Sequence, residues 1–217
     1  MEIKALFFDL DGLLLDTEKV YLHCWVEAAK ALGYQLDISD ALQLRSCDSQ
    51  LAKRIIEESC HNHSAYDQIR AKRKEIMANY TQINPIEIKN GVTVFFQSSI
   101  VDKYKKYIVT SAISEEKLIV LEKAGVLETI DGVITTKQVN RGKPYPDVYL
   151  FAAQKACVAS NECIAFEDSP NGVISASSAG CRVIMIPDLT QPSEDLRAKC
   201  DFVLPSLSDA LTVLTKF

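Results

Sequence analysis

The sequence predicts an α/β protein in which a doubly wound parallel sheet forms the core and an α-helical domain is inserted into it. Short apolar runs with high β propensity alternate with helical patterns over most of the chain. One long interval near the N-terminus has helical periodicity instead and contains no convincing strand. A chain of 217 residues is also long enough to bury a substantial core without metal or disulfide staples.

Five runs are predicted to be buried parallel strands. The first, residues 3–9 (IKALFFD), is apolar up to its acidic end and has too little polar alternation for a half-exposed strand. The other four are equally short, and they cover residues 107–110, 132–136, 163–167 and 182–186. Because ligands bind outside the carboxyl ends of the strands in such sheets, we expect the functional residues at that edge.

The interval that starts near residue 17 is predicted to be helical. Its apolar residues recur at helical spacing, first at Val20, Cys24, Ala28 and Ala31. The helical segment is expected to end at Asn84, because a residue that precedes proline is disfavoured in the helical region. The predicted domains are therefore a sheet-containing core of residues 1–16 and 86–217 and a helical cap of residues 17–85.

Composition and charge exclude several classes of protein. With 24 Lys and Arg against 29 Asp and Glu, the formal net charge of -5 argues against a surface built mainly for nucleic acid or an anionic membrane. The seven cysteines form no C-x-x-C pair, so neither a disulfide framework nor a zinc ribbon is indicated. No run approaches the roughly 18 uninterrupted apolar residues of a membrane span. We expect a soluble, cytoplasmic protein, a monomer by default, without a nucleic-acid or membrane partner.

Two carboxylates close the first predicted strand. Asp9 and Asp11 stand at positions i and i+2, so their side chains are expected on one side of the chain. Two acids in one small space repel each other, so a bound Mg²⁺, with one acid as nucleophile and the other as acid/base, fits the pattern. The alternative is a simple turn, because Asp-Gly, here Asp11-Gly12, is a common turn pair.

A second acidic pair, Glu167 and Asp168, follows the predicted strand at residues 163–167. In a doubly wound sheet this pair converges on the same edge as Asp9, and three or four acids with other oxygen ligands suit Mg²⁺. The alternative is a helix N-cap, because Asp168 or Ser169 would serve to cap a helix that opens near Pro170.

Hydroxyl and ammonium groups are candidates for contacts with phosphoryl oxygens. Thr110 and Ser111 end another predicted strand, although both residue types are also common helix caps. Lys143 follows a glycine and precedes a stiff Pro-x-Pro segment, which would aim its ammonium group at a fixed point. Solvent exposure is the alternative for such a loop lysine. Asp147 is expected to cap the helix that starts near Val148.

Four segments carry a resemblance to a known family. They are FFDLDGLLLDT, VTSA, RGKPYPD and FEDSPNGV, and in this order they resemble the four motifs of the haloacid dehalogenase superfamily. The chain is most similar to the subgroup that contains β-phosphoglucomutase and small-metabolite phosphatases, in which a helical cap is inserted between the first and second motifs. The resemblance implies a Rossmann-like core and an enzyme that acts on a small phosphorylated substrate.

The resemblance also implies roles for the residues that match the motifs. Asp9 would be the nucleophile that takes the phosphoryl group as an aspartyl phosphate, and Asp11 would protonate the leaving oxygen and then activate water. Thr110, Ser111 and Lys143 would bind the phosphoryl oxygens. True dehalogenases usually lack the second aspartate, so the presence of Asp11 favours phosphoryl transfer over cleavage of a carbon-halogen bond.

A divalent cation is part of the same expectation. By the resemblance, Mg²⁺ is held by the Asp9 carboxylate, the Asp11 backbone carbonyl and Asp168, with Glu167 as a further ligand or as an acceptor beside the site. In such transfers nearly all of the catalysis consists of positioning and charge stabilisation. The substrate expected from the sequence is a sugar, polyol or nucleoside phosphate.

Three functions are open at this point of the sequence: a phosphatase, a phosphosugar mutase and a non-catalytic phosphate-binding module. β-Phosphoglucomutases typically carry a histidine where this chain has Tyr21, and they tend to show a G-x-x-R pattern that would fall here on Leu44 and Cys47, with Arg45 displaced. These departures favour a phosphatase over a phosphosugar mutase. A non-catalytic phosphate-binding module is the third reading, but it would be expected to lose Asp9, Asp11 or Lys143.

Some other features are expected to be structural. The segment 60–63 (CHNH) is expected to form a surface turn rather than a metal site, because no second ligand cluster accompanies it. Arg45 and the basic run at 70–74 are expected on solvated helix faces. Trp25 is expected in the core of the cap.

Overall fold

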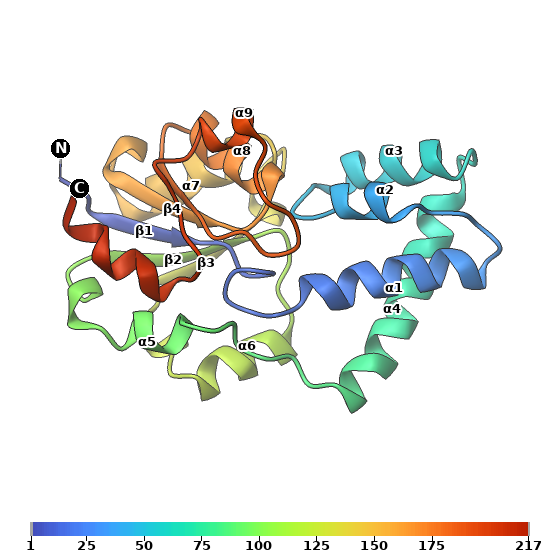
Figure 1. Cartoon of the computed structure of the whole chain (residues 1–217), viewed down its shortest axis with the longest axis horizontal. Helices are drawn as coiled ribbons and strands as arrows, with labels where there is room; N and C mark the ends of the chain where they lie inside the picture. Colours follow the sequence, from blue (N-terminus) through green and yellow to red (C-terminus); the bar gives the residue numbers. More distant parts are fainter. Residues whose placement is uncertain (1, 217) are drawn as a thin grey trace.

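The computed structural model describes residues 2–216 and has a parallel sheet at its centre (Figure 1). In the described chain the sheet has six strands in the order β3-β2-β1-β4-β5-β6, which confirms the doubly wound α/β prediction. The strands are β1 (Ala5–Phe8), β2 (Lys105–Thr110), β3 (Gly132–Thr135), β4 (Cys163–Glu167), β5 (Arg182–Met185) and β6 (Phe202–Val203). The first five correspond to the predicted runs, whereas β6, only two residues long, was not predicted.

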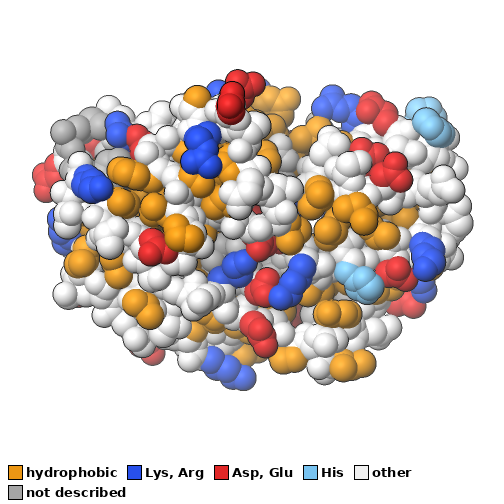
Figure 2. All heavy atoms as spheres, viewed as in Figure 1, with side chains coloured by type: hydrophobic (Ala, Val, Ile, Leu, Met, Phe, Trp, Pro, Cys, Tyr) orange, Lys and Arg blue, Asp and Glu red, His pale blue; other side chains and the backbone are white. Residues whose placement is uncertain are grey.

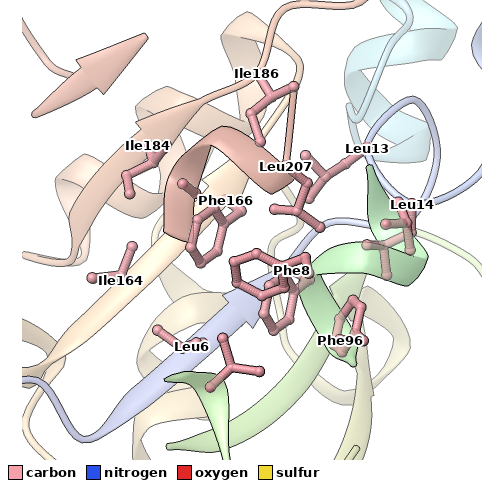
Figure 3. Packing of buried hydrophobic residues seen from close by; sticks show 14 of the residues in the cluster. Leu6, Phe8, Leu13, Leu14, Phe96, Ile164, Phe166, Ile184, Ile186 and Leu207 are labelled. Carbon is pink, nitrogen blue, oxygen red and sulfur yellow. The ribbon is translucent and has the colours of Figure 1, made fainter. Parts of the chain in front are cut away.

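Helices cover both faces of the sheet, because side chains alternate between the faces along each strand. On one face Leu6 and Phe8 pack with α5 (Val92–Phe96) and α6 (Glu115–Lys123), and Figure 3 shows Phe8 against Phe96 and Phe166. On the other face Phe7 packs with α7 (Asp147–Ala156), α8 (Pro170–Ser178) and α9 (Glu194–Arg197). Burial on both faces explains the nearly continuous apolar run of β1.

Short 3-10 helices complete this part of the chain. They cover Ser99–Val101, Leu127–Thr129, Thr136–Gln138, Ser160–Glu162, Ser208–Thr212 and Leu214–Lys216.

Residues 18–83 contain four helices and no strand, as the periodicity predicts. These are α1 (Glu18–Ala31), α2 (Ile38–Gln43), α3 (Ser49–Ser59) and α4 (Ala65–Ile83), and they lie to one side of the sheet (Figure 1). Their buried residues form a hydrophobic cluster of their own. Asn84 leaves the helical region, with φ -118° and ψ 93°, directly before Pro85. On these grounds we propose the division into a core (1–16 and 86–217) and a cap (17–85).

The register of the sheet brings the candidate residues to one edge. Phe8 pairs with Ile108 of β2 and with Phe166 of β4, so the next residue, Asp9, lies beside the ends of both neighbouring strands. The backbone N–H of Asp9 also donates to the carbonyl oxygen of Phe166 at 3.0 Å. Asp9, Thr110 and Glu167 are therefore neighbours in space, although Thr110 follows Asp9 by 101 positions and Glu167 follows Thr110 by 57.

Asp147 does not have the role that the sequence predicted. It is the first residue of α7, preceded by Pro146, and its carboxylate pairs with Arg141 at 3.1 Å instead of capping the helix. The fixed φ of proline suits the start of a helix, and an acid in the first turn is favourable to the helix dipole. None of the helices described between residues 2 and 216 is both long and apolar enough to cross a membrane.

Candidate active site

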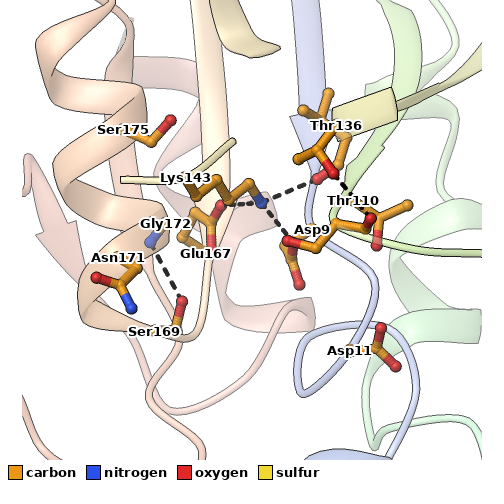
Figure 4. A network of polar contacts seen from close by, with 12 residues as sticks. Asp9, Asp11, Thr110, Thr136, Lys143, Glu167, Ser169, Asn171, Gly172 and Ser175 are labelled. Carbon is orange, nitrogen blue, oxygen red and sulfur yellow. Dashed lines mark hydrogen bonds and ion pairs between the residues drawn. The ribbon is translucent and has the colours of Figure 1, made fainter. Parts of the chain in front are cut away.

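Lys143 is the cation at the centre of the site. Its Nζ donates to Asp9 Oδ1 at 2.5 Å and to Glu167 Oε1 at 2.6 Å, as well as to the carbonyl oxygen of Val109 at 3.0 Å (Figure 4). The lysine side chain is fully buried. Burial alone would lower its pKa, but the charges of Asp9 and Glu167 raise the pKa above its ordinary value. The exposed alternative for this lysine is wrong, because the 142–146 loop directs it into the sheet edge.

Three carboxylates lie close together beside this lysine. One oxygen from each of Asp9, Glu167 and Asp168 lies within 4.8 Å of the others. Burial raises the pKa of Asp9, with Lys143 opposing the shift, and burial followed by the Asp9 charge raises the pKa of Asp168 well above its usual range. Burial likewise raises the pKa of Glu167 to about 7. The site thus holds more negative charge than one lysine neutralises.

The free oxygens of these carboxylates fit a hard divalent cation. Asp9 Oδ2, Glu167 Oε2 and both oxygens of Asp168 are buried and have no hydrogen-bond partner within residues 2–216. Buried oxygens that lack partners are rare and costly, and an all-oxygen set is the kind of site that Mg²⁺ or a similar ion takes. The residues present therefore fit the metal that the resemblance implies.

Two glycines allow the backbone to approach these acids. A Cβ on Gly172 would lie 1.8 Å from Glu167 Oε2, and a Cβ on Gly12 would lie 2.4 Å from Asp168 Oδ2. Gly12 also has φ +87°, a left-handed conformation that side chains disfavour. Any larger residue at either position would displace a carboxylate of the cluster.

Ser169, not Asp168, caps the helix that follows β4. The N–H of Gly172 donates to Ser169 Oγ at 3.2 Å, with Pro170 in the first turn of α8. The capping alternative considered for Asp168 is therefore wrong. Because the cap is already provided, the Asp168 carboxylate remains available to the acidic cluster.

Asp11 has partners of its own. It lies on the loop after β1, apart from the Lys143 network in Figure 4. Thr17 Oγ1 donates to Asp11 Oδ1 at 2.5 Å, and Lys117 Nζ donates to Asp11 Oδ2 at 2.5 Å. Lys117 belongs to α6 and was not among the residues predicted from the sequence. The only signal was its place seven residues after Thr110, in the first turns of a helix that begins at the same edge.

The two hydroxyl residues at the end of β2 differ in their contacts. Thr110 is buried, and its Oγ1 donates to the carbonyl oxygen of Ala112 at 3.1 Å. Ser111 Oγ is buried without a partner in the described chain and borders a cavity. Ser111 is thus the hydroxyl with a free hydrogen-bonding capacity at this edge.

A cavity of about 400 Å³ lies between the sheet edge and the cap helices. Figure 2 shows charged side chains of both signs near this boundary. The core contributes Asp11, Ser111, Ala112, Thr136 and Gly142 to its wall, and the cap contributes Glu18, Tyr21, Trp25, Arg45, Tyr66 and Arg73. A space of this size is typical of small-molecule sites.

Two arginines expected on solvated helix faces are instead part of this wall. Arg45 is only 5% exposed, and its Nη2 donates to Thr190 Oγ1 at 2.5 Å. The guanidinium group of Arg73 lies 4.6 Å from the ring centre of Trp25 and 5.1 Å from that of Tyr21. Which helix face turns inward depends on how the four helices pack, and a charged run alone does not reveal this.

The other expectations for this region hold. The segment 60–63 forms a turn between α3 and α4, and its residues 61–63 are exposed. Trp25 packs against the cap core and stacks with Tyr66, with ring centres 6.4 Å apart. It also faces the cavity, which the sequence did not indicate.

Comparison with protein-family models matches residues 6–186 to the haloacid dehalogenase-like hydrolases. The chain belongs to this family.

Hexitol phosphatase A of Escherichia coli (strain K12) is 29% identical to this chain, and the match covers 95% of this chain and 93% of the relative. Beta-phosphoglucomutase of Bacillus subtilis (strain 168) is 23% identical, with 82% of this chain and 80% of the relative covered. The crystal structure of a hydrolase from Pseudomonas syringae shares the fold, with a TM-score of 0.83 at 20% identity over 99% of both chains. The resemblance drawn from the motifs is thus confirmed.

In this haloacid dehalogenase-like hydrolase the cap contacts the core directly at the mouth of the site. Asn171 Nδ2 donates to the carbonyl oxygens of Gln43 and Arg45 at 3.2 and 2.8 Å. The N–H of Asp48 donates to the carbonyl oxygen of Lys143 at 3.0 Å. The segment between α2 and α3 therefore rests on the Lys143 loop and on the start of α8, which carry two of the four motifs, and it lines the cavity on that side.

The acidic cluster predicts how stability changes with pH in metal-free solution. Glu167 has a pKa of about 7 in the folded protein, above its ordinary value of 4.5, so between these values the folded chain holds a proton that the unfolded chain has lost. The resulting stabilisation is present at low pH and lost as the pH rises through 7. Asp9 and Asp168 are shifted in the same direction. The free energy of unfolding in chelator is expected to fall by a few kcal/mol between about pH 5 and pH 7.5.

Urea unfolding in EDTA at a series of pH values measures this dependence. Asp168→Asn and Glu167→Gln variants should each flatten the slope, and Mg²⁺ should restore stability at pH 7.5. A metal-free protein whose stability rises over this range, with the same slope in the two variants, would contradict the prediction.

Proposed function

We propose that this protein is a Mg²⁺-dependent phosphohydrolase that acts on a small phosphorylated metabolite through an aspartyl-phosphate intermediate. One observation carries the proposal. Asp9 has one buried carboxylate oxygen without a partner, Oδ2, and lies beside the ammonium group of Lys143 and two more acids, while Asp11, two residues further along, borders a cavity of metabolite size. Membership of a hydrolase family and the phosphatase named among the relatives support the same function.

The first step is transfer of the phosphoryl group to Asp9. The Asp9 carboxylate attacks phosphorus, the bond from phosphorus to the alcohol oxygen breaks, and Asp11 gives its proton to that oxygen. Lys143 and the Ser111 hydroxyl offset charge on the phosphoryl oxygens. Lys143 also fixes the orientation of Asp9 through the 2.5 Å contact to its Oδ1. The result is a free alcohol and an aspartyl phosphate.

The second step releases phosphate. Asp11, now a carboxylate, takes a proton from water, the water oxygen attacks phosphorus, and the bond to Asp9 breaks to restore its carboxylate. The residues that would hold the metal are Asp9, Asp168 and the main-chain carbonyl of Asp11, with Glu167 beside them. When bound, Mg²⁺ supplies positive charge that offsets the acids and the phosphoryl oxygens.

The cavity wall supports a small polar substrate. Aromatic rings of Tyr21, Trp25 and Tyr66 and the guanidinium groups of Arg45 and Arg73 would surround the leaving alcohol. Sugar, polyol and nucleoside phosphates all fit this chemistry. In this proposal the core performs the chemistry and the cap selects the alcohol.

A phosphosugar mutase of the β-phosphoglucomutase type is the second candidate, favoured by the mutase among the relatives. Tyr21 stands where such mutases carry a histidine, and Cys47, whose thiol donates to the Leu44 carbonyl oxygen at 3.1 Å, stands where they tend to carry an arginine. Both departures favour transfer to water. A non-catalytic binding module is disfavoured because Asp9, Asp11 and Lys143 are all present.

A screen of phosphorylated metabolites with Mg²⁺ tests the proposal. Inorganic phosphate and isomerised product are measured separately for each compound, with EDTA as the matched control. Release of phosphate that stops in EDTA supports a phosphohydrolase, isomer without phosphate identifies a mutase, and neither product from any compound or from an aryl phosphate rejects catalysis.

A further inference from the structure

A lysine outside the four motifs is buried against the proposed acid/base residue. Lys117 is 3% exposed, and its Nζ lies 2.5 Å from Asp11 Oδ2. The carbonyl oxygen of Ala112 is a second, longer acceptor at 3.4 Å, and the ring of Tyr21 lies over the ammonium group with its centre 5.3 Å away. Burial alone would lower the pKa of Lys117, but the Asp11 charge raises the pKa above its ordinary value. Lys117 therefore stays charged beside Asp11.

The two carboxylate oxygens of Asp11 accept hydrogen bonds from residues on two different parts of the fold. Thr17, the residue before α1 of the cap, donates to Oδ1, and Lys117 on α6 of the core donates to Oδ2. Asp11 sits on a loop that reverses at Gly12, so its backbone has no strand neighbours to restrain it beyond a single bridge to Leu15. The direction of its carboxylate is set by these two side chains.

Burial of an ammonium group is costly unless an acid pairs with it. In the described chain the carboxylate paired with Lys117 is that of Asp11, which also borders the cavity. Charge neutralisation of the metal cluster does not explain the lysine, because Lys143 already contacts Asp9 and Glu167. The buried ammonium group of Lys117 is therefore paired with Asp11, the acid whose carboxylate must point in a defined direction for proton transfer.

We propose that Lys117 is a positioning residue that fixes the carboxylate of Asp11 toward the leaving oxygen of the substrate. The inference rests on the proposed function, since it requires Asp11 to act as the acid. It assigns Lys117 no contact with the phosphoryl group. Its effect should therefore depend on whether the leaving group needs a proton.

A comparison of two substrates distinguishes an effect of Lys117 on the position of the acid from an effect on substrate binding or on folding. An alkyl phosphate has a poor leaving group that needs a proton, whereas p-nitrophenyl phosphate releases a stable phenolate without one. The measured quantity is kcat/KM, which covers the steps up to release of the alcohol or phenol. The ratio of the two kcat/KM values is independent of the fraction of protein that is folded, so a partly unfolded variant still gives an answer.

Lys117→Met keeps the length of the side chain and removes its charge. We expect kcat/KM for the alkyl phosphate to fall about 30-fold, a part of the 10²–10⁴-fold that general acid-base catalysis supplies, with little change for p-nitrophenyl phosphate. Lys117→Arg should recover most of the alkyl activity, because it keeps the charge. Lys123→Met, at the exposed end of the same helix, is the matched control and should leave the ratio unchanged.

Equal losses for the two substrates, or a rise in KM alone, would assign Lys117 to substrate binding or to stability and overturn the inference. Asp11→Asn is measured in parallel. If Asp11→Asn lowers the alkyl rate and Lys117→Met does not change the ratio, the inference fails and the proposed function stands. If Asp11→Asn leaves the alkyl rate intact, Asp11 is not the acid and the inference fails with its premise, whereas absence of phosphate release by the unmodified protein would reject the proposed function.

Discussion

An Asp9→Asn variant is expected to lose turnover by about 10⁴-fold or more while it keeps the native fold. The amide is a far weaker nucleophile than the carboxylate, so no aspartyl phosphate should form. The fold should persist because the amide oxygen can still accept the hydrogen bond from Lys143, and Lys143 keeps its contact with Glu167. Removal of one buried charge from a crowded acidic cluster also relieves repulsion of Asp168. Phosphate release, acid-quench trapping of the phosphoenzyme and thermal unfolding measure the three parts of this prediction.

Asp102→Asn provides the matched control. It makes the same chemical change at an exposed aspartate remote from the motifs, and it should leave turnover within about twofold. Turnover by Asp9→Asn within tenfold of the unmodified protein, or a phosphoenzyme trapped in that variant, would mean that another group is the nucleophile.

The strands that carry the site were predictable because short apolar runs with little polar alternation are typical of buried parallel strands. β1 and β4 are apolar and β2 is apolar after its first two residues; β2 and β4 end in a hydroxyl and an acid, an acid follows β1 directly, and parallel packing brings these ends to one edge. The two-residue strand β6 was missed because two residues carry no periodicity. Its place at the edge of the sheet is set by contacts with β5, which only the fold supplies.

Two of the side chains missed in the site, Arg73 and Lys117, come from helices, and which face of a helix points inward depends on tertiary packing. Arg73 lies within a basic run typical of a solvated helix face, yet the packing of α4 on α1 turns it against Tyr21 and Trp25. Lys117 has the same ambiguity on α6. By contrast, Lys143 lies between a glycine and a proline that restrict its backbone. The sequence therefore indicated that its ammonium group points to a fixed place, and the structure has it beside Asp9 and Glu167.

A Lys143→Met variant is expected to lose both activity and stability. The fully buried ammonium group pairs with Asp9 at 2.5 Å and with Glu167 at 2.6 Å, so its removal leaves two buried carboxylates without their counter-charge. Breaking a buried ion pair in this way costs about 3–5 kcal/mol at neutral pH, although methionine nearly fills the space of the lysine chain. Turnover should fall by about 10²–10³-fold through loss of a preorganised charge at the phosphoryl group.

The same variant should become relatively more stable in acid. Without Lys143 the opposing effect on the pKa values of Asp9 and Glu167 is gone, so both rise further above their ordinary values and the folded state binds protons more readily. Stability that depends on a raised carboxyl pKa is present at low pH and lost as the pH increases. Urea unfolding of both proteins in EDTA should therefore give a smaller difference at pH 5 than at pH 7.5.

The double variant Lys143→Met with Glu167→Gln separates the two effects. It removes one of the two stranded charges, so it should recover a large part of the lost stability and none of the lost turnover. Such a result agrees with a lysine that stabilises the protein by pairing with the acids and that serves the reaction through the positive charge it places beside Asp9. A single variant destabilised by less than about 1 kcal/mol, or a double variant as unstable as the single one, would show that the carboxylates do not depend on Lys143 for their charge balance.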